Sequence, residues 1–159
     1  MRKTIVMTIV LLCTIVQGAW AQEPATIGSI SYNSTLAAYE IKRAANLNDL
    51  AVYVNGSGTY STGGSESTAH DCTGMTFKQT AGITYNYDNL AEGASNFTAI
   101  GNSSHPFNGH FDGGENTISG IRIRQGSSNC QGLFGETGTN AEVEDLTLTE
   151  CNGRRLLPQ

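Results

Sequence analysis

The residues between His105 and Glu115 carry the side chains best suited to chemistry in this chain. In the run 106–123, PFNGHFDGGENTISGIRI, His110 and Asp112 place an imidazole and a carboxylate two positions apart, and His105 lies just upstream. Such groups could hold a metal ion or transfer protons. A metal site needs three or four converging ligands, and acid hydrolysis of a sugar needs two opposed carboxylates. Asp112 and Glu115 flank a turn sequence, so their spacing does not indicate opposition across a substrate.

The strand period gives this run a simpler interpretation. If residues 107–112 are extended, alternate side chains share a face, so Phe107 and Phe111 point inward while His110 and Asp112 point outward. The Asp-Gly-Gly that follows is typical of a turn, because Asp bonds locally and Gly accepts positive φ. We therefore expect the outward side of a corner here, with no catalytic residue, metal ligand or cofactor site, and at most an incidental metal contact.

The N-terminal segment 1–21 has the features of a secretory signal peptide. A basic pair precedes an almost unbroken apolar run at 4–16, and Ala19 and Ala21 supply small residues just before Gln22. The apolar run is too short to span a bilayer comfortably. We expect cleavage before Gln22, no membrane span afterwards, and a chain exported to the periplasm, the cell surface or the medium.

Composition narrows the class of protein. The chain has a net charge of −5, only 14 % charged residues and 19 glycines. An acidic chain without a basic cluster is not typical of proteins that bind nucleic acid or anionic lipid. Scarce charge with many glycines is typical of a sheet-rich extracellular domain with tight turns, and 38 % hydrophobic residues argue against disorder.

Three cysteines follow the expected cleavage site, and an odd number cannot pair fully within one molecule. Cys130 and Cys151 are close enough in sequence to lie on neighbouring turns of a repeating fold. A Cys130–Cys151 disulfide is therefore possible; otherwise these two and Cys72 are ordinary small side chains. None of the cysteines has the spacing of a zinc site.

A single short helix is predicted at 46–55. Asn46 is a plausible N-cap, apolar residues then recur at helical spacing, and Gly56 can end the helix. The preceding residues from Ala38 alternate as in a strand, and the polar, glycine-rich stretch 55–74 is predicted to be a long surface loop.

Two later runs, ISGIRI at 118–123 and VEDLTL at 143–148, share an unusual order of apolar and polar residues. Three apolar positions correspond across a displacement of 25 residues: Ile118 with Val143, Ile121 with Leu146, and Ile123 with Leu148. A fixed displacement of this size indicates stacked coils that bury their apolar rows on one another. Hairpins of a β-sandwich remain the alternative. We favour a mostly β chain forming a parallel β-helix of few coils with one short N-terminal capping helix.

Four motifs occur in a fixed order: FTAIGN at 97–102, the run 106–123, GLFG at 132–135, and AEVEDLTL at 141–148. Together they resemble the GLUG-repeat proteins of bacterial surfaces, especially those of gut Bacteroidales. YEIKRAANLNDLAVYVNGSG is similar to the segment before the first coil of such proteins. The resemblance covers roughly 38–150 and implies a right-handed parallel β-helix capped at its N-terminus. Members are commonly associated with adhesion or with presenting other domains, and some accompany peptidase domains.

Departures from the family pattern occur in the first coil and at the end. Gln79 stands where a leucine is expected, GLFG occurs once, and the final residues 151–159, CNGRRLLPQ, show neither a strand pattern nor a closing cap. We therefore divide the chain into the signal peptide, a lead-in at 22–37, the β-helix at 38–150, and an unstructured or truncated tail. An open coil end could alternatively pair with a partner.

The motif residues are interpreted as architectural. In GLFG, a bend at one glycine would let both apolar side chains reach the core. The structural motif comprises Phe107, Phe111, Gly113, Ile118, Ile121, Ile123, Gly132, Leu133, Phe134 and Gly135.

The functional expectation is a non-catalytic, secreted or cell-surface scaffold of a Gram-negative gut bacterium, used for adhesion or interaction. The alternative is an incomplete or accessory part of a glycan- or protein-degrading enzyme, because polysaccharide lyases also use β-helices. Partners are not identified by the sequence; host or glycan ligands and further coils of a longer protein are the possibilities. Tyr53, Tyr60, Tyr85 and Tyr87 could stack on sugars if exposed, or pack inside the helix.

Overall fold

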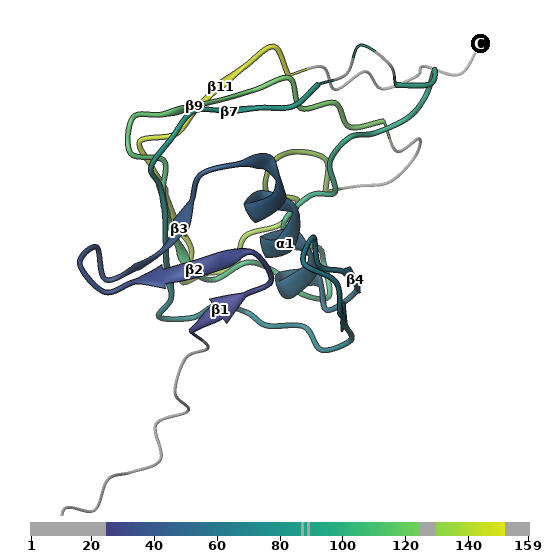
Figure 1. Cartoon of the computed structure of the whole chain (residues 1–159). Coiled ribbons are helices and arrows are strands. Elements are labelled where there is room, and N and C mark those ends of the chain that lie inside the picture. Colours follow the sequence, from purple (N-terminus) through teal and green to yellow (C-terminus); the bar gives the residue numbers. More distant parts are fainter. Residues whose placement is uncertain (1–24, 87, 89, 125–129, 152–159) are drawn as a thin grey trace, which may run out of the picture.

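A computed structural model describes residues 25–86, 88, 90–124 and 130–151 (Figure 1). This part of the chain is mostly β with one short helix, and many of its strands pair in parallel. None of its helices is both long and apolar enough to cross a membrane. The expected signal peptide at 1–21 and the tail beyond Cys151 lie outside the described residues.

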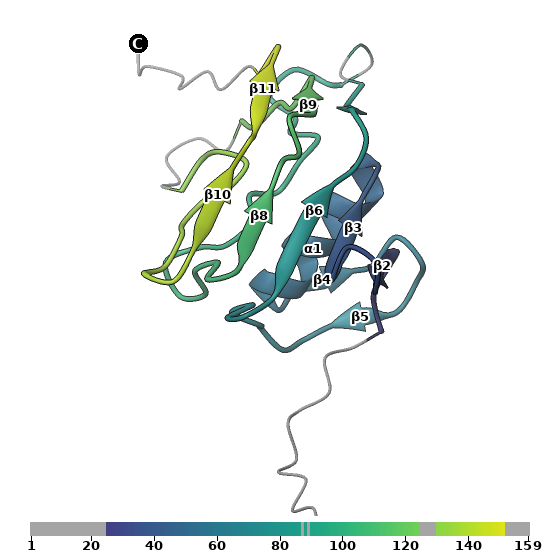
Figure 2. The same cartoon turned by 90° about the vertical axis from the view of Figure 1, so that its left-hand side faces the viewer.

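The larger sheet has six strands in the order β1-β2-β3-β6-β8-β10 (Figure 2). These strands are β1 (Thr26–Ile27), β2 (Ile30–Asn33), β3 (Ala38–Ile41), β6 (Thr76–Gln79), β8 (His110–Asp112) and β10 (Glu142–Glu144). β1 pairs with β2, and β2 with β3, in antiparallel fashion, whereas the pairings from β3 to β10 are parallel. Parallel neighbours require the chain to leave the sheet and return between strands.

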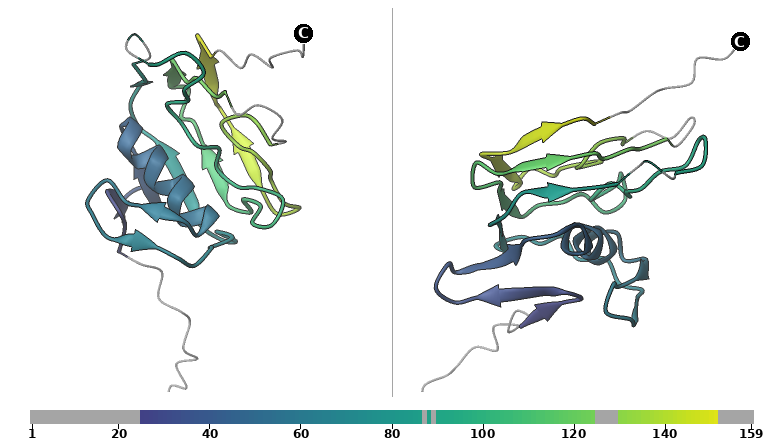
Figure 3. Two further views of the ribbon diagram at one scale, coloured as in Figure 1. Left: turned by 90° about the vertical axis from the view of Figure 1, so that its right-hand side faces the viewer. Right: turned by 45° about the horizontal axis from the view of Figure 1, so that its top comes forward.

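Those returns build a second, three-stranded parallel sheet in the order β11-β9-β7. Its strands are β7 (Ile83–Thr84), β9 (Thr117–Ser119) and β11 (Thr147–Thr149). Each follows the corresponding strand of the larger sheet, so three successive passes of the chain contribute one strand to each sheet (Figure 3). A separate antiparallel pair, β4 (Gly58–Thr59) and β5 (Ser65–Glu66), lies within the predicted surface loop.

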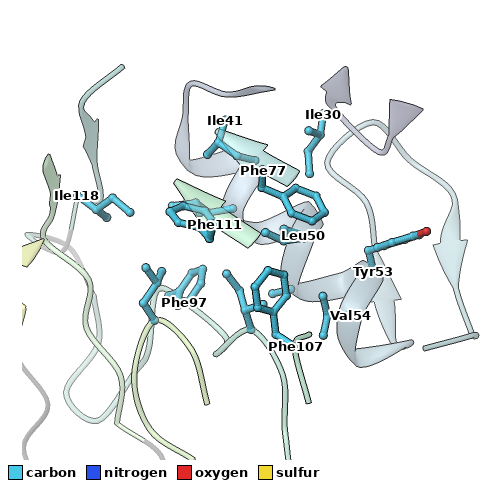
Figure 4. Close-up of a cluster of buried hydrophobic side chains, with 14 of the residues drawn as sticks. Ile30, Ile41, Leu50, Tyr53, Val54, Phe77, Phe97, Phe107, Phe111 and Ile118 are labelled. Carbon is cyan, nitrogen blue, oxygen red and sulfur yellow. The ribbon is translucent and has the colours of Figure 1, made fainter. Parts of the chain in front are cut away.

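An apolar column runs through the parallel part of the larger sheet. Tyr39 is the register partner of Phe77, Phe77 of Phe111, and Phe111 of Val143. The first three are at most 1 % exposed, and the rings of Tyr39 and Phe77 stack with centroids 5.3 Å apart. Figure 4 shows Phe77, Phe107 and Phe111 gathered in this core with Leu50 of the helix. Stacking of like residues in register is how these short strands bury their inner faces.

Helix α1 (Ala44–Asn55) covers this core with Leu47, Leu50 and Val54, none of which is exposed. Gly56 ends it in the left-handed conformation, with φ of 63°, as the sequence predicts. The predicted N-cap is wrong, because Arg43 holds that position and Asn46 lies inside the first turn. Asn46 instead accepts a hydrogen bond from the Lys42 N–H at 3.0 Å and donates to the Ser29 carbonyl oxygen at 3.0 Å.

The predicted lead-in at 22–37 is not separate from the fold. β1 and β2 both lie in it, and β2 pairs with β3 through Tyr32 and Tyr39. The two rings meet edge to face, with centroids 5.3 Å apart. The sheet therefore begins before residue 38, the boundary that the sequence indicated.

The 25-residue correspondence between ISGIRI and VEDLTL is also wrong. The structure pairs Ile118 with Leu148, not Val143, and pairs Val143 with Phe111. VEDLTL is not one strand: Asp145, with a left-handed φ of 48°, turns the chain from β10 into β11. One corner uses Gly113 to Asn116 and the next uses only Asp145 and Leu146, so the spacing between paired residues varies from about 30 to 35.

Gln79, where the resemblance to GLUG-repeat proteins led us to expect a leucine, occupies an inward position and is not exposed. Its amide Nε2 donates to the carbonyl oxygens of Ala81 at 2.8 Å and Thr117 at 3.3 Å. Its Oε1 has no hydrogen-bond partner among the described residues. The amide therefore links the corner after β6 to the start of β9 in the following pass.

The Cys130–Cys151 disulfide that the sequence left open is not formed, because both thiols are free. Cys130 Sγ lies 3.5 Å from Glu136 Oε2, whereas Cys151 is exposed and its Sγ lies 3.4 Å from the Thr149 carbonyl oxygen. The two residues therefore bond to different local partners. Cys72 is buried in the hydrophobic core.

Candidate interaction surface

The His110–Asp112 pair lies on the outer face of β8, where the strand period places it. Phe107 and Phe111 are fully buried, while His110 and Asp112 are partly exposed. In register with them on the adjacent strands are Thr76 and Lys78 of β6 and Glu142 and Glu144 of β10. The outer face of these three strands is therefore a charged patch, which we call the outer charged face: Lys78, His110, Asp112, Glu142 and Glu144.

Lys78 and Asp112 form an ion pair across β6 and β8. Asp112 Oδ1 also accepts a hydrogen bond from the Gly114 N–H at 2.7 Å. The hydrogen bond from Lys78 holds the pKa of Asp112 below its usual value, and the same contact raises the pKa of Lys78. Asp112 is therefore an ionised, engaged carboxylate, which suits a structural charge better than a general acid.

His110 Nε2 lies 2.9 Å from Glu144 Oε1, on the adjacent strand. With Glu142 these residues offer three donor atoms that lie within 4.8 Å of one another. Imidazole and carboxylates are ligands that a divalent cation takes, but both glutamates are exposed, and the same geometry serves as a surface ion pair. Sequence reasoning missed both glutamates. The alternation in Glu142-Val143-Glu144 would have placed them beside His110 had the 32-residue register been known.

His105 and Glu115 do not join this group. His105 is exposed in a turn, where its N–H donates to the Asn102 carbonyl oxygen at 3.0 Å. Glu115 adopts a left-handed φ of 58° in the corner between β8 and β9. Asp112 ends β8 and Glu115 lies in the corner that follows it, so their carboxylates flank a turn as the sequence indicated.

The other motif residues fill the core or its corners. Ile118, Ile121, Ile123 and Leu133 are at most 7 % exposed. Phe134 is half-buried, with its ring centroid 5.1 Å from that of Phe107, so both apolar residues of GLFG reach the core.

The glycines of these motifs lie where the chain passes close to itself. A Cβ on Gly113 would collide with the Asp145 carbonyl oxygen, and one on Gly135 would collide with that of Gly101. A Cβ on Gly132 would lie 3.0 Å from the Phe134 carbonyl oxygen.

The last strand of each parallel sheet is exposed. Val143 of β10 and Leu148 of β11 are 41 % and 43 % exposed, whereas their partners Phe111 and Ile118 are fully buried. Within the described ranges no strand pairs with the far side of β10 or β11. We call these two strands the open edge (Figure 3).

A cleft of about 400 Å³ lies elsewhere, between α1 and the segment 95–98. Asn48, Asn55 and Asn96 are among its polar lining residues. Asn55 bonds the Ala99 carbonyl oxygen at 2.9 Å and the Gly101 N–H at 3.0 Å, so its amide joins the helix to that segment. Phe97, the aromatic residue in the lining, is only 4 % exposed and offers little surface for stacking.

The tyrosines considered as sugar-stacking residues lie mostly inside. Tyr53 and Tyr85 are 8 % and 6 % exposed, and Tyr60 is partly buried. Tyr53 stacks on His70 with ring centroids 3.9 Å apart, and the Tyr85 hydroxyl donates to the Ala44 carbonyl oxygen at 3.1 Å. Tyr87 lies outside the described residues. The three described rings therefore serve packing.

Comparison with known proteins gives no match: no family model, no curated protein and no solved structure matches the chain. The resemblance to GLUG-repeat proteins therefore rests on the motifs in the sequence alone.

Proposed function

We propose that the chain is an exported, right-handed parallel β-helix that acts as a non-catalytic scaffold for adhesion or interaction at the surface of a Gram-negative gut bacterium. The observation that carries this proposal is the shared register of successive passes. Phe77, Phe111 and Val143 form one column, and Ile83, Ile118 and Leu148 form another on the second sheet. Two parallel columns visited in the same order by each pass are the signature of a coiled repeat.

The third side of each coil supports the same arrangement. Ile100 forms an isolated parallel bridge with Phe134, and Phe107 forms one with Thr137. The GLFG segment thus stacks on the FTAIGN segment as β8 stacks on β6. The antiparallel strands β1 and β2 and helix α1 cover the first coil, which suits the role of an N-terminal cap.

A scaffold role is supported by how the polar groups are used. On the outer charged face Asp112 is engaged by Lys78 and by the Gly114 N–H, and His110 is paired with Glu144. Such mutual pairing stabilises a surface and leaves little unsatisfied chemistry for a substrate.

The proposal is tested in two parts. Hydrogen exchange should protect the amides of β6, β8 and β9 as one cooperative unit; rapid exchange of β8 would overturn the coiled repeat. For function, the exported chain is applied to glycan arrays and to immobilised matrix proteins, with the chain unfolded in urea as a matched control. Binding that requires the folded chain supports adhesion, and no binding to either panel overturns it.

A further inference from the structure

The open edge has the properties of a surface that adds another strand. β10 and β11 each present unpaired backbone N–H and C=O groups on one side, because within the described part of the chain neither has a second neighbour. Their inward residues Val143 and Leu148 are more than 40 % exposed, although the same columns are fully buried one strand earlier. At this edge, therefore, backbone groups lack strand partners and the apolar column is only partly buried.

The charges along this edge predict which side chains an added strand would carry. Along the outer face the register positions read Glu40, Lys78, Asp112 and Glu144, so the signs alternate until the last step places two carboxylates side by side. In the neighbouring column His110 is followed by Glu142. Opposite charges on adjacent strands stabilise a sheet and like charges destabilise it. A strand added to β10 would therefore carry basic residues opposite Glu142 and Glu144 and an apolar residue opposite Val143.

The second sheet extends this pattern. Leu148 lies between Thr147 and Thr149 in β11, which bears no charge. A strand that follows β10 and β11 in the same direction would place a second apolar residue five positions after the first, over Leu148. The complementary sequence is therefore basic–apolar–basic, then a short corner, then an apolar residue between small polar residues.

Pairing with the same edge of a second copy is unfavourable. Two β10 strands meeting side by side would bring together the glutamates of both copies, with no cation between them. Among the described residues, Arg122-Ile123-Arg124 has the complementary pattern, but Ile123 is buried and the backbone N–H groups of Arg122 and Arg124 bond to Asn96 and Ser95. Neither β10 of a second copy nor the described part of this chain therefore supplies the basic residues that would complement the edge.

We propose that the open edge binds an extended segment of another polypeptide chain, in parallel with β10 and β11, through the pattern basic–apolar–basic. This inference rests on the proposed function, because it names the kind of partner that the scaffold would take. Backbone hydrogen bonds supply affinity in such strand addition, and alternate side chains supply specificity.

The test uses the exported chain and a fluorescein-labelled peptide, Lys-Val-Lys-Asn-Gly-Thr-Val-Thr, with binding measured by fluorescence anisotropy. The double substitution Glu142→Lys/Glu144→Lys should weaken binding at least tenfold, and a peptide with Glu-Val-Glu in place of Lys-Val-Lys should bind this variant but not the unmodified chain. The matched control is Asp88→Lys/Glu92→Lys, which makes the same change of charge at exposed positions in the loop after β7. A peptide of identical composition with its alternation shifted by one residue should not bind, because the shift turns its basic residues inward.

Three results would overturn the inference. Equal loss of binding in the two double variants would mean non-specific attraction of charge, and equal binding of the shifted peptide would mean that register does not matter. A dimer in sedimentation velocity that Glu142→Lys/Glu144→Lys dissociates would mean that a second copy occupies the edge. Failure of the inference is distinguishable from failure of the fold. If the peptide does not bind while the β6 and β8 amides stay protected from exchange, only the proposed partner is overturned. If the β8 amides are not protected, the coiled repeat itself is overturned.

Discussion

Phe77 of β6 and Phe111 of β8 are register partners on adjacent parallel strands, and neither side chain is exposed. The next residue of the same column, Val143, is 41 % exposed. One column thus passes from the core to the exposed edge between two adjacent strands. Substitutions in the column should therefore cost less stability at the edge than in the core.

The substitution Phe111→Ala should lower the free energy of unfolding by about 3–5 kcal/mol, because it removes a buried ring and leaves a cavity. Val143→Ala should lower it by less than about 1 kcal/mol, because much of that side chain is already in water. Urea denaturation followed by circular dichroism measures both. Equal losses would contradict the exposed edge.

Gly135→Ala should destabilise the fold by about 1–3 kcal/mol, because its Cβ would collide with the Gly101 carbonyl oxygen and lie 2.9 Å from that of Cys130. Gly82→Ala is the matched control, since its nearest neighbour would be the Thr117 carbonyl oxygen at 3.8 Å and its φ is not positive. The control should be neutral or stabilising by up to about 1 kcal/mol. Thermal melting compares the two; an unchanged melting temperature for Gly135→Ala would show that the corner can widen.

Periodicity identified the buried faces but not the stacking register. The alternation of Phe107 and Phe111 with His110 and Asp112 follows from strand geometry alone, so their burial was predictable. The partner of Ile118 was not, because it depends on where the chain turns. Asp145 turns the chain with a φ of 48° although it is not a glycine. The corner after β10 is two residues shorter than the corner after β8. A pattern search with a fixed displacement cannot detect corners of unequal length.

The surface chemistry was missed for the same reason. Glu142 and Glu144 come within reach of His110 only through the pairing of β8 with β10, which joins residues far apart in sequence. Asn46 is of a residue type that suits an N-cap. Its side-chain oxygen instead accepts a hydrogen bond from the Lys42 N–H at 3.0 Å, and its side-chain amide donates to Ser29. Tertiary partners therefore override the local preference at this helix start.

Asp49 provides a test of pH dependence. Burial by itself would raise the pKa of this carboxyl, but hydrogen bonds donated by Ser61 and Ser29, the shortest at 2.6 Å, hold it below the usual 3.8. Its stabilising contribution is therefore complete above the unfolded pKa near 3.8 and is lost as the pH falls through the lower folded pKa. Asp49→Asn should be less stable at pH 7, and the difference should shrink on acidification.

Urea midpoints at neutral pH, near the unfolded pKa and well below it would measure this difference. Asp88→Asn, at an exposed position, is the control and should follow the unmodified chain at every pH. A difference for Asp49→Asn that stays constant with pH would show that the loss comes from packing and not from the charge.

The cysteines should react with a thiol reagent at different rates. Burial raises the pKa of the Cys130 thiol, as does its hydrogen bond to Glu136, and only the thiolate is nucleophilic. In reduced, folded protein at pH 8, exposed Cys151 should therefore react first and Cys130 more slowly, with buried Cys72 reacting only on unfolding. Glu136→Gln should accelerate Cys130, and Cys151→Ser should abolish the fast phase. Identical kinetics in Glu136→Gln would contradict this contact.

Export should remove the first 21 residues. Expressed in a Gram-negative host, the chain should be recovered outside the cytoplasm with a mass that starts at Gln22. Ala19→Arg should block the cleavage, because the position three residues before the cleaved bond requires a small side chain. Glu23→Gln is the control on the other side of that bond and should be processed normally. Intact-mass spectrometry distinguishes these outcomes, and an uncleaved chain in both variants would contradict the signal peptide.

The buried amide of Gln79 favours one alignment of the successive passes of the chain. Strands that carry only apolar inner residues can slide by two positions without turning any side chain to solvent, because the period of a strand is two. Sliding would separate the Gln79 amide from the Thr117 carbonyl oxygen of the next pass, at 3.3 Å, whereas its bond to Ala81 in the same pass, at 2.8 Å, would remain. Leucine at this position would add apolar contact but could not form this bond between passes. The glutamine thus favours the observed alignment through one hydrogen bond between successive passes.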